Sequence, residues 1–209
     1  GQIVLGAFTV AFELAPPFVM GHFLLSLVLV ANAVVLHERA AADEPAGPAV
    51  PIVSRATRRL TLAVLLALAV AVVAGTVVTA TGPHGGDEEA PRFGFDIEHV
   101  TRIHSVAVIA FVGLVLAVLG VAAKEGAPER FLARGRAVVV ASSVQAGIGW
   151  IQWFAGVPAL LVGLHILGAT VVWAAACRFV LATRAEPVAV PAGGAEVARA
   201  PTALAGQGG

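Results

Sequence analysis

The segment PPFVMGHFLLSLVLVANAVVL, residues 16–36, is apolar throughout apart from a few small polar side chains and one histidine, His22. It is 21 residues long, close to the roughly 20 apolar residues with which an α-helix crosses a bilayer. An imidazole inside such a helix loses its hydration, so it needs a hydrogen bond, a charged partner or a metal ion. The segment therefore predicts a membrane-spanning helix and marks His22 as a candidate functional residue.

The composition of the whole chain supports the same class of protein. Of its 209 residues 58% are hydrophobic and 12% are charged, and the mean hydropathy is +0.91, whereas a soluble domain is about 45–50% apolar. The formal net charge is zero, and no basic cluster with interleaved aromatic residues points to nucleic acid. The single cysteine, Cys177, excludes an internal disulfide. We therefore expect an all-α polytopic membrane protein with the lipid bilayer as its main partner.

Six segments approach the length of a membrane span. They are residues 1–13, 15–37, 58–81, 96–123, 135–155 and 157–183. Three stretches separate some of them: an Ala/Pro-rich linker at 38–57, a polar loop at 82–94 and a basic loop at 124–134. The Ala/Gly/Pro-rich tail at 185–209 is predicted to be disordered. The chain opens GQIVLG without an initiator Met, so we expect it to begin inside a helix, with part of the protein missing.

Charge predicts the orientation. If the six segments alternate, one side carries most of the basic residues, namely Arg39, Arg55, Arg58, Arg59, Lys124, Arg130, Arg134, Arg136, Arg178 and Arg184. The other side carries Asp87, Glu88 and Glu89 with only Arg92 and Arg102. By the positive-inside rule the first side is cytoplasmic, and both ends of the chain are expected there.

Three histidines share one predicted depth. His22, His104 and His165 each lie about seven or eight residues into a helix that starts on the outer side. At about 1.5 Å per residue, all three imidazoles are expected roughly 10–13 Å below the outer helix ends. Three unrelated histidines are unlikely to coincide in this way, so the pattern favours a shared role.

A shift of 143 residues aligns the chain with itself and indicates an internal repeat. The matches that carry the evidence are Gln2 with Gln145, Gly6 with Gly149 and His22 with His165. Because His104 lies 61 residues before His165, a counterpart for His22 would fall before the start of the chain. We therefore expect a complete four-helix transmembrane bundle at 58–184, and in residues 1–37 the last two helices of a second, incomplete repeat bundle.

Two histidines at one depth on facing helices suit axial coordination of a haem iron. A structural zinc would require three or four converging ligands, and few others are available near His104 and His165. Gly147, Gly149 and Ser105 are expected to leave room for a flat ring. The alternative is that each histidine is a hydrogen-bonded packing residue, and for His22 the two interpretations stay open.

The run FDIEHVTRIH, residues 95–104, is the densest polar stretch near the outer side. Asp96 is a candidate N-cap, and an acid such as Glu98 in the first turn favours the helix dipole. The functional alternative is that Glu98, His99 or Arg102 contacts haem propionates or moves protons. The sequence leaves this choice open.

These residues resemble a known family. The runs QIVLGAFTV, PPFVMGHF, IEHVTRIH and SVQAGIG followed by VGLHILGA are similar to haem A synthase, particularly the actinobacterial type, over nearly all of residues 1–183. The resemblance implies two four-helix bundles, a haem b cofactor between His104 and His165, and a substrate, haem O, with His22 as one ligand. It also implies oxidation of a ring methyl to a formyl group by successive hydroxylations. Glu98 resembles the glutamate at the matching place of the second bundle.

The resemblance further implies a multi-pass protein of the bacterial plasma membrane that works with haem O synthase and terminal oxidase assembly. The family's catalytic glutamate would lie in the missing helices, so we expect this chain to be inactive alone. A cysteine pair common in an outer loop of the family is absent from residues 82–94. Two other functions remain open: a bis-histidine cytochrome b subunit that only carries electrons, and a transporter with histidine proton relays.

Overall fold

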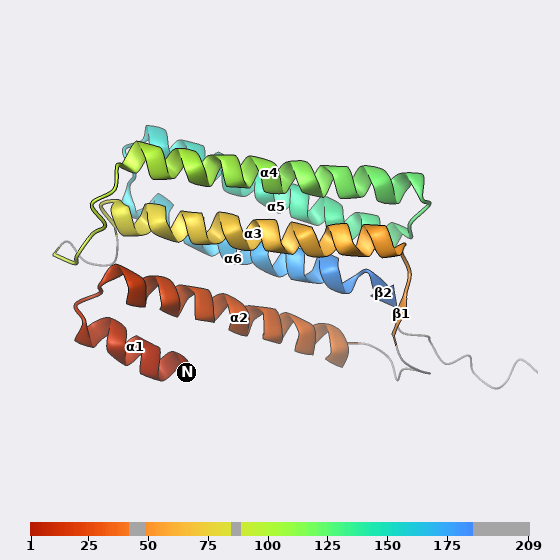
Figure 1. Ribbon diagram of the computed structural model, residues 1–209, viewed down its shortest axis with the longest axis horizontal. Helices are drawn as coiled ribbons and strands as arrows, with labels where there is room; N and C mark the ends of the chain where they lie inside the picture. Colours follow the sequence, from red (N-terminus) through yellow and green to blue (C-terminus); the bar gives the residue numbers. More distant parts are fainter. Residues whose placement is uncertain (42–48, 85–88, 186–209) are drawn as a thin grey trace, which may run out of the picture.

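The computed structural model describes residues 1–41, 49–84 and 89–185. In this part of the chain it contains six α-helices and one short strand pair (Figure 1). The helices are α1 (Gln2–Ala11), α2 (Pro16–Ala40), α3 (Arg55–Thr81), α4 (Ile97–Lys124), α5 (Glu129–Phe154) and α6 (Ala159–Leu181). Helices α2 to α6 are each long and apolar enough to cross a membrane, whereas α1 has only 10 residues. The predicted class, an all-α polytopic membrane protein, is confirmed.

Helices α3 to α6 form two antiparallel hairpins that pack side by side (Figure 1). The contacts within the α3–α4 pair and within the α5–α6 pair are much more extensive than those between the two hairpins. Apolar side chains fill the interior, among them Phe111, Phe131 and Phe179, which are all buried. The α1–α2 hairpin lies outside this bundle, where α2 packs mainly against α6.

Helix α5 begins six residues earlier than the apolar pattern predicted. Residues 129–134 were expected in a loop, but they form the first turns of α5. Pro128 stands at the N-cap, where its fixed backbone torsion suits helix entry. Phe131 is fully buried and packs on Phe179, with 4.7 Å between the ring centroids. This contact between the two rings holds the first turn of α5 in place. The arginines of the same segment had favoured a loop.

The linker is also shorter than expected, because α2 continues to Ala40 and α3 starts at Arg55. Within it, β1 (Val50–Pro51) pairs antiparallel with β2 (Arg184–Ala185), which places Val50 opposite Ala185. Two-residue strands have no periodicity that a sequence could reveal. The sequence predicts a disordered tail at 185–209, and residues 186–209 of this tail lie outside the described residues.

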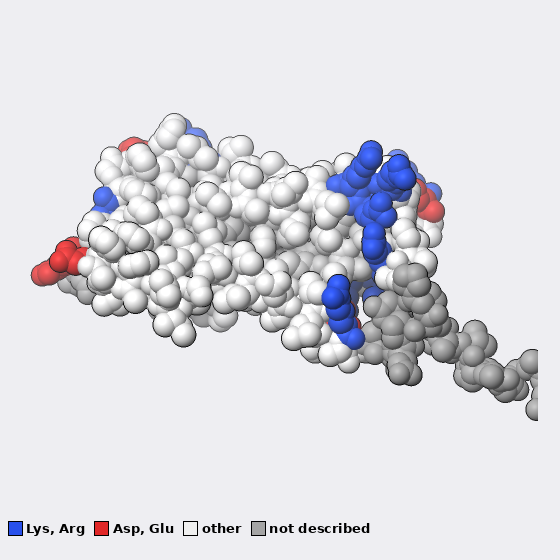
Figure 2. Space-filling model, turned by 60° about the horizontal axis from the view of Figure 1, so that its bottom comes forward, with Lys and Arg blue, Asp and Glu red and all other residues white. Residues whose placement is uncertain are grey.

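The two ends of the molecule differ in charge. Most of the Lys and Arg side chains visible in Figure 2 gather at the right-hand end, where α3 begins and α4 ends in Figure 1. We call this the basic end. There Glu38 of α2 accepts hydrogen bonds from Arg178 of α6 at 2.5 Å and from Arg134 of α5 at 3.4 Å. One carboxylate therefore ties the α1–α2 hairpin to the bundle.

The turns that join α1 to α2 and α5 to α6 repeat each other in detail. Glu13 and Leu14 have φ values of 52° and 57°, and their counterparts 143 residues later, Gly156 and Val157, have 76° and 57°. In each turn the second of these residues donates its N–H to a carbonyl five residues earlier, at 2.8 Å. Consecutive left-handed residues are uncommon outside glycine. The internal repeat inferred from side chains is therefore also present in the backbone.

Candidate functional site: a histidine pair between two hairpins

The three intramembrane histidines occupy equivalent positions in their helices. His22 is the seventh residue of α2, His104 the eighth of α4 and His165 the seventh of α6. All three helices run from the end opposite the basic end. At about 1.5 Å per residue, the imidazoles lie about 9–11 Å along the helices from that end. Each imidazole therefore lies at nearly the same distance from the start of its own helix, and the structure brings His104 and His165 to one level.

Each of these histidines packs against a glycine of the other helix in its own hairpin. The pairs are Gly6 with His22, Gly75 with His104 and Gly149 with His165. A Cβ placed on Gly75 or Gly149 would lie 3.0 Å from the histidine Cε1, and one on Gly6 would lie 3.3 Å away. Carbon atoms normally approach to about 3.5–4.0 Å. The absence of a side chain at these positions is therefore what lets each imidazole lie where it does.

His104 and His165 face each other across the boundary between the two hairpins of the bundle. Their ring centroids are 6.4 Å apart and the ring planes meet at 78°. Both side chains are partly buried. In the part of the chain that the structure describes, no group of three or more His, Cys, Asp or Glu side chains is placed to hold a metal ion. The site thus offers two imidazoles as ligands, with no third His, Cys, Asp or Glu beside them among the described residues.

The orientation of the His104 ring is fixed by its backbone partner. Nδ1 of His104 lies 2.9 Å from the carbonyl oxygen of Ala71, in α3. A carbonyl only accepts hydrogen bonds, so Nδ1 carries the hydrogen and Nε2 keeps its lone pair. Histidine ligands of metals commonly donate their second ring N–H to a backbone carbonyl in this way. His104 is therefore held in the tautomer that a ligand bonding through Nε2 requires.

Glutamine side chains brace the other two histidine helices, as the repeat predicts. Gln145 of α5 donates through Nε2 to the carbonyl oxygen of His165 at 2.6 Å. Gln2 of α1 donates to the carbonyl oxygen of His22 at 3.1 Å, and its Nε2 also lies 3.4 Å from Nε2 of His22. Each glutamine therefore bonds the backbone of the histidine helix in its own hairpin. Among the described residues His22 has no histidine partner comparable to the pair in the bundle.

Two of the three small residues expected beside the pair lie elsewhere. Gly149 packs on His165 as predicted, but a Cβ on Gly147 would meet no atom within 4 Å, and Ser105 is exposed and bonds within its own helix. These two predictions were wrong because their positions face outward on α5 and α4. Gly75 takes the corresponding role beside His104 and was missed. A single glycine inside an apolar helix is the signal that could have found it.

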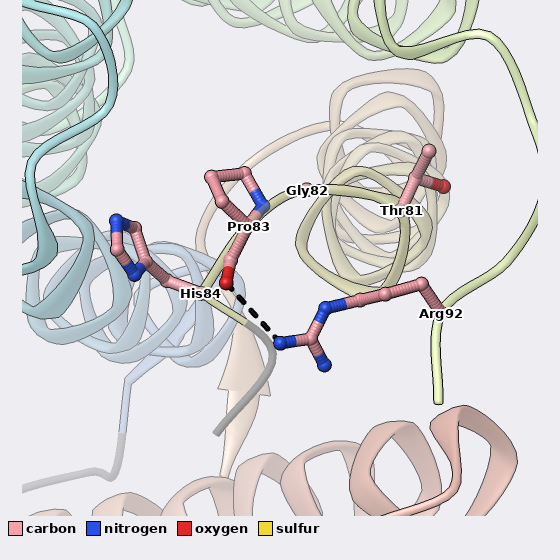
Figure 3. A pocket seen from close by; sticks show the side chains of 5 residues that line it. All are labelled: Thr81, Gly82, Pro83, His84 and Arg92. Carbon is pink, nitrogen blue, oxygen red and sulfur yellow. Dashed lines mark hydrogen bonds between the residues drawn. The ribbon is translucent and has the colours of Figure 1, made fainter. Parts of the chain in front are cut away.

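The polar run before His104 mainly forms the start of α4. The Asp96 side chain accepts the N–H of His99 at 2.7 Å, which confirms Asp96 as the N-cap. Glu98 is exposed in the first turn. A surface pocket at this end of the molecule is lined by Thr81, Gly82, Pro83, His84 and Arg92, where Arg92 donates to the Pro83 carbonyl at 3.1 Å (Figure 3). None of the three intramembrane histidines lines this pocket.

No protein-family model matches the chain, and no curated protein or solved structure shows significant similarity to it. The fold and the side chains therefore carry the functional argument. They define a multi-pass helical membrane protein in which the imidazoles of His104 and His165 face each other between two hairpins. A third imidazole, that of His22, occupies the equivalent position in the repeated α1–α2 hairpin.

Proposed function

We propose that this chain is a membrane oxidoreductase of the haem A synthase type, with haem b held by His104 and His165 as its resident cofactor. The observation that carries the proposal is the 6.4 Å between the two ring centroids. A metal–imidazole bond is about 2.0–2.1 Å and the ring centre lies about 1.1 Å behind the nitrogen, so two imidazoles that held one metal ion between them would have ring centroids about 6.3 Å apart. The histidine pair has the separation that one metal ion between the rings requires.

The residues around the pair also suit this role. The Ala71 carbonyl keeps Nε2 of His104 free to bond. Gly75 and Gly149 let both rings approach the neighbouring helices. The two hairpins contact each other less extensively than the helices within each hairpin do, so a flat ring would be expected to enter at this boundary. When bound there, haem b supplies one-electron redox chemistry, tuned by two neutral imidazole ligands.

The substrate assignment rests on the internal repeat and on the resemblance to haem A synthase. His22 repeats His165 in its glycine contact and its glutamine brace. We assign it as one ligand of the substrate, haem O, whose ring methyl is oxidised to a formyl group to give haem A. Glu98 is the candidate second-bundle glutamate near the cofactor.

We also propose how the protein is oriented in the membrane and which proteins it works with. The basic end is cytoplasmic by the positive-inside rule, so the histidine sites lie toward the outer side of a bacterial plasma membrane. Haem O would come from a haem O synthase in the same membrane, and haem A would be passed to terminal oxidase assembly.

Haem content is the first test. The complete gene product is purified with and without the substitutions His104→Ala and His165→Ala, and haem b is measured by its absorption spectrum. Either substitution should abolish the bis-histidine spectrum, while His37→Ala, an exposed histidine of α2, should leave it unchanged. A wild-type protein without haem would contradict the proposal and favour a transporter with histidine proton relays.

Conversion of haem O is the second test, and it separates the synthase from a cytochrome b subunit that only carries electrons. Haem is extracted from cells that express the complete gene with a haem O supply, and its side chains are identified by mass spectrometry. The synthase predicts haem A, and it predicts that His22→Ala blocks conversion but retains haem b. Haem b with no haem A would identify the electron carrier instead.

A further inference from the structure

The lipid-facing side of α3 ends in two arginines. Its exposed apolar side chains are Leu62, Leu66, Val70 and Val73, with 46%, 68%, 63% and 43% of their surface accessible. Their spacing of three or four residues places them on one face of the helix, and that face continues through Arg59 to Arg55, which are both exposed. The opposite face, which includes Thr57, Thr61 and Val64, is buried in the bundle. Arg55 and Arg59 therefore lie where the lipid-facing surface reaches the headgroups.

The carboxylates at the basic end are already used by other groups. In the described part of the chain they are Glu38, Glu125 and Glu129. Glu38 pairs with Arg134 and Arg178, Glu129 pairs with Arg136, and Glu125 accepts hydrogen bonds from Ser54 and Thr57. Across the described ranges 1–41, 49–84 and 89–185, neither Arg55 nor Arg59 forms an ion pair. Within the described ranges, these two guanidinium groups thus face the lipid without a carboxylate partner.

Helix stability does not explain the arginine at the start of α3. The first turn of α3 contains Arg55, Arg58 and no acidic residue. The N-terminus of a helix carries partial positive charge, so a cation there costs about 0.3–1 kcal/mol, whereas an anion is favoured. A phosphate group bound at this point would interact favourably with both the helix terminus and the side chains.

We propose that Arg55 and Arg59 bind the headgroup of an anionic phospholipid whose acyl chains lie along Leu62, Leu66, Val70 and Val73. The guanidinium groups donate hydrogen bonds to the phosphate oxygens, and the apolar face of α3 contacts the chains. The site lies at the basic end, away from the histidine pair, and does not depend on haem. The proposed partner is thus an anionic lipid of one leaflet rather than the bilayer in general.

The test measures lipid selectivity on the purified complete gene product in detergent. Native mass spectrometry counts bound lipid during titration with palmitoyl-oleoyl phosphatidylglycerol or with the matching phosphatidylcholine, and thermal unfolding is followed in parallel. The wild type should retain phosphatidylglycerol preferentially and be stabilised by it. At about fivefold per arginine near a membrane surface, Arg55→Gln with Arg59→Gln should weaken phosphatidylglycerol binding about thirtyfold.

The matched control removes the same charge elsewhere at the basic end, by Lys124→Gln with Arg130→Gln, both exposed. It should keep phosphatidylglycerol binding within about twofold of the wild type. Equal loss in both double variants, or equal binding of the two lipids by the wild type, would overturn the proposal. Glycerol phosphate, which has no acyl chains, should not stabilise the wild type. If it stabilised the protein as much as phosphatidylglycerol does, the site would bind phosphate alone, and the lipid site would be refuted. If the double variant fails to fold, the proposal is still tested by whether the wild type binds phosphatidylglycerol in preference to phosphatidylcholine.

Discussion

The substitution Gly149→Ala tests whether the glycine contact sets the histidine geometry. A Cβ at this position would lie 3.0 Å from Cε1 of His165, whereas carbon atoms pack at about 3.5–4.0 Å. The imidazole or the helix must therefore move by about 0.5–1.0 Å. Metal–ligand distances hold to about ±0.2 Å. A displacement of this size takes His165 out of bonding range of a metal placed midway between the two rings.

The same substitution should leave the fold largely intact. Alanine in place of glycine stabilises a helix by about 0.8–1.0 kcal/mol, and overpacking typically costs about 1–3 kcal/mol. The two effects partly offset each other, so the net destabilisation of Gly149→Ala is about 0–2 kcal/mol. A loss of haem without a loss of folded protein is therefore the expected signature.

The assay compares the haem-to-protein ratio and the low-spin signal of the oxidised iron. We expect haem affinity to fall by about 10–100-fold in Gly149→Ala, as for removal of a group that orients a metal ligand. Gly147→Ala, on the same helix, is the matched control because a Cβ there meets no atom within 4 Å. Full haem content with an unchanged low-spin signal in Gly149→Ala would refute the reasoning. So would an equal loss in Gly147→Ala.

Three further substitutions test other contacts. Gly75→Ala should reduce the low-spin signal through His104, where the approach is also 3.0 Å, and an intact signal would contradict this contact. Trp173→Phe removes the 2.9 Å hydrogen bond from the indole to the Leu27 carbonyl and should lower the free energy of unfolding by about 0.6–1.7 kcal/mol, measured by thermal unfolding in detergent. Glu38→Gln removes both arginine ion pairs and should lower the melting temperature more at low salt than at high salt. A salt-independent change would argue against an electrostatic role.

The sequence predicts most of the fold because membrane helices have a strong signal. A run such as residues 16–36 has one structural solution in a bilayer, since its backbone polar groups must be satisfied within the segment. The start of α5 was misplaced for the opposite reason. Its first turns are charged, and what holds them is a tertiary contact of Phe131 with Phe179. The β1–β2 pair likewise depends on two distant segments meeting, which leaves no local pattern.

The candidate site was predicted in part. The equal depth of His104 and His165 follows from counting residues along helices, and the structure brings these two side chains together. Two features that orient them could not be predicted from residue types. The Ala71 carbonyl is a backbone group that every residue possesses, so only the packing of α3 against α4 selects it. Which glycines face a histidine depends on helix rotation, and this is why Gly147 was chosen wrongly and Gly75 was missed.

His22 differs from His104 in the ring nitrogen that the protein engages, and this difference bears on their separate roles. His104 is held through Nδ1, which leaves Nε2 free to bond a ligand. At His22, the amide of Gln2 lies 3.4 Å from Nε2 itself, and the same amide also contacts the His22 carbonyl and Ser26. If haem O binds through Nε2 of His22, the Gln2 amide must first give up its contact with that nitrogen. A ligand nitrogen that already has a hydrogen-bond partner would suit a substrate that arrives and leaves, whereas a nitrogen without one would suit the resident haem b proposed for His104.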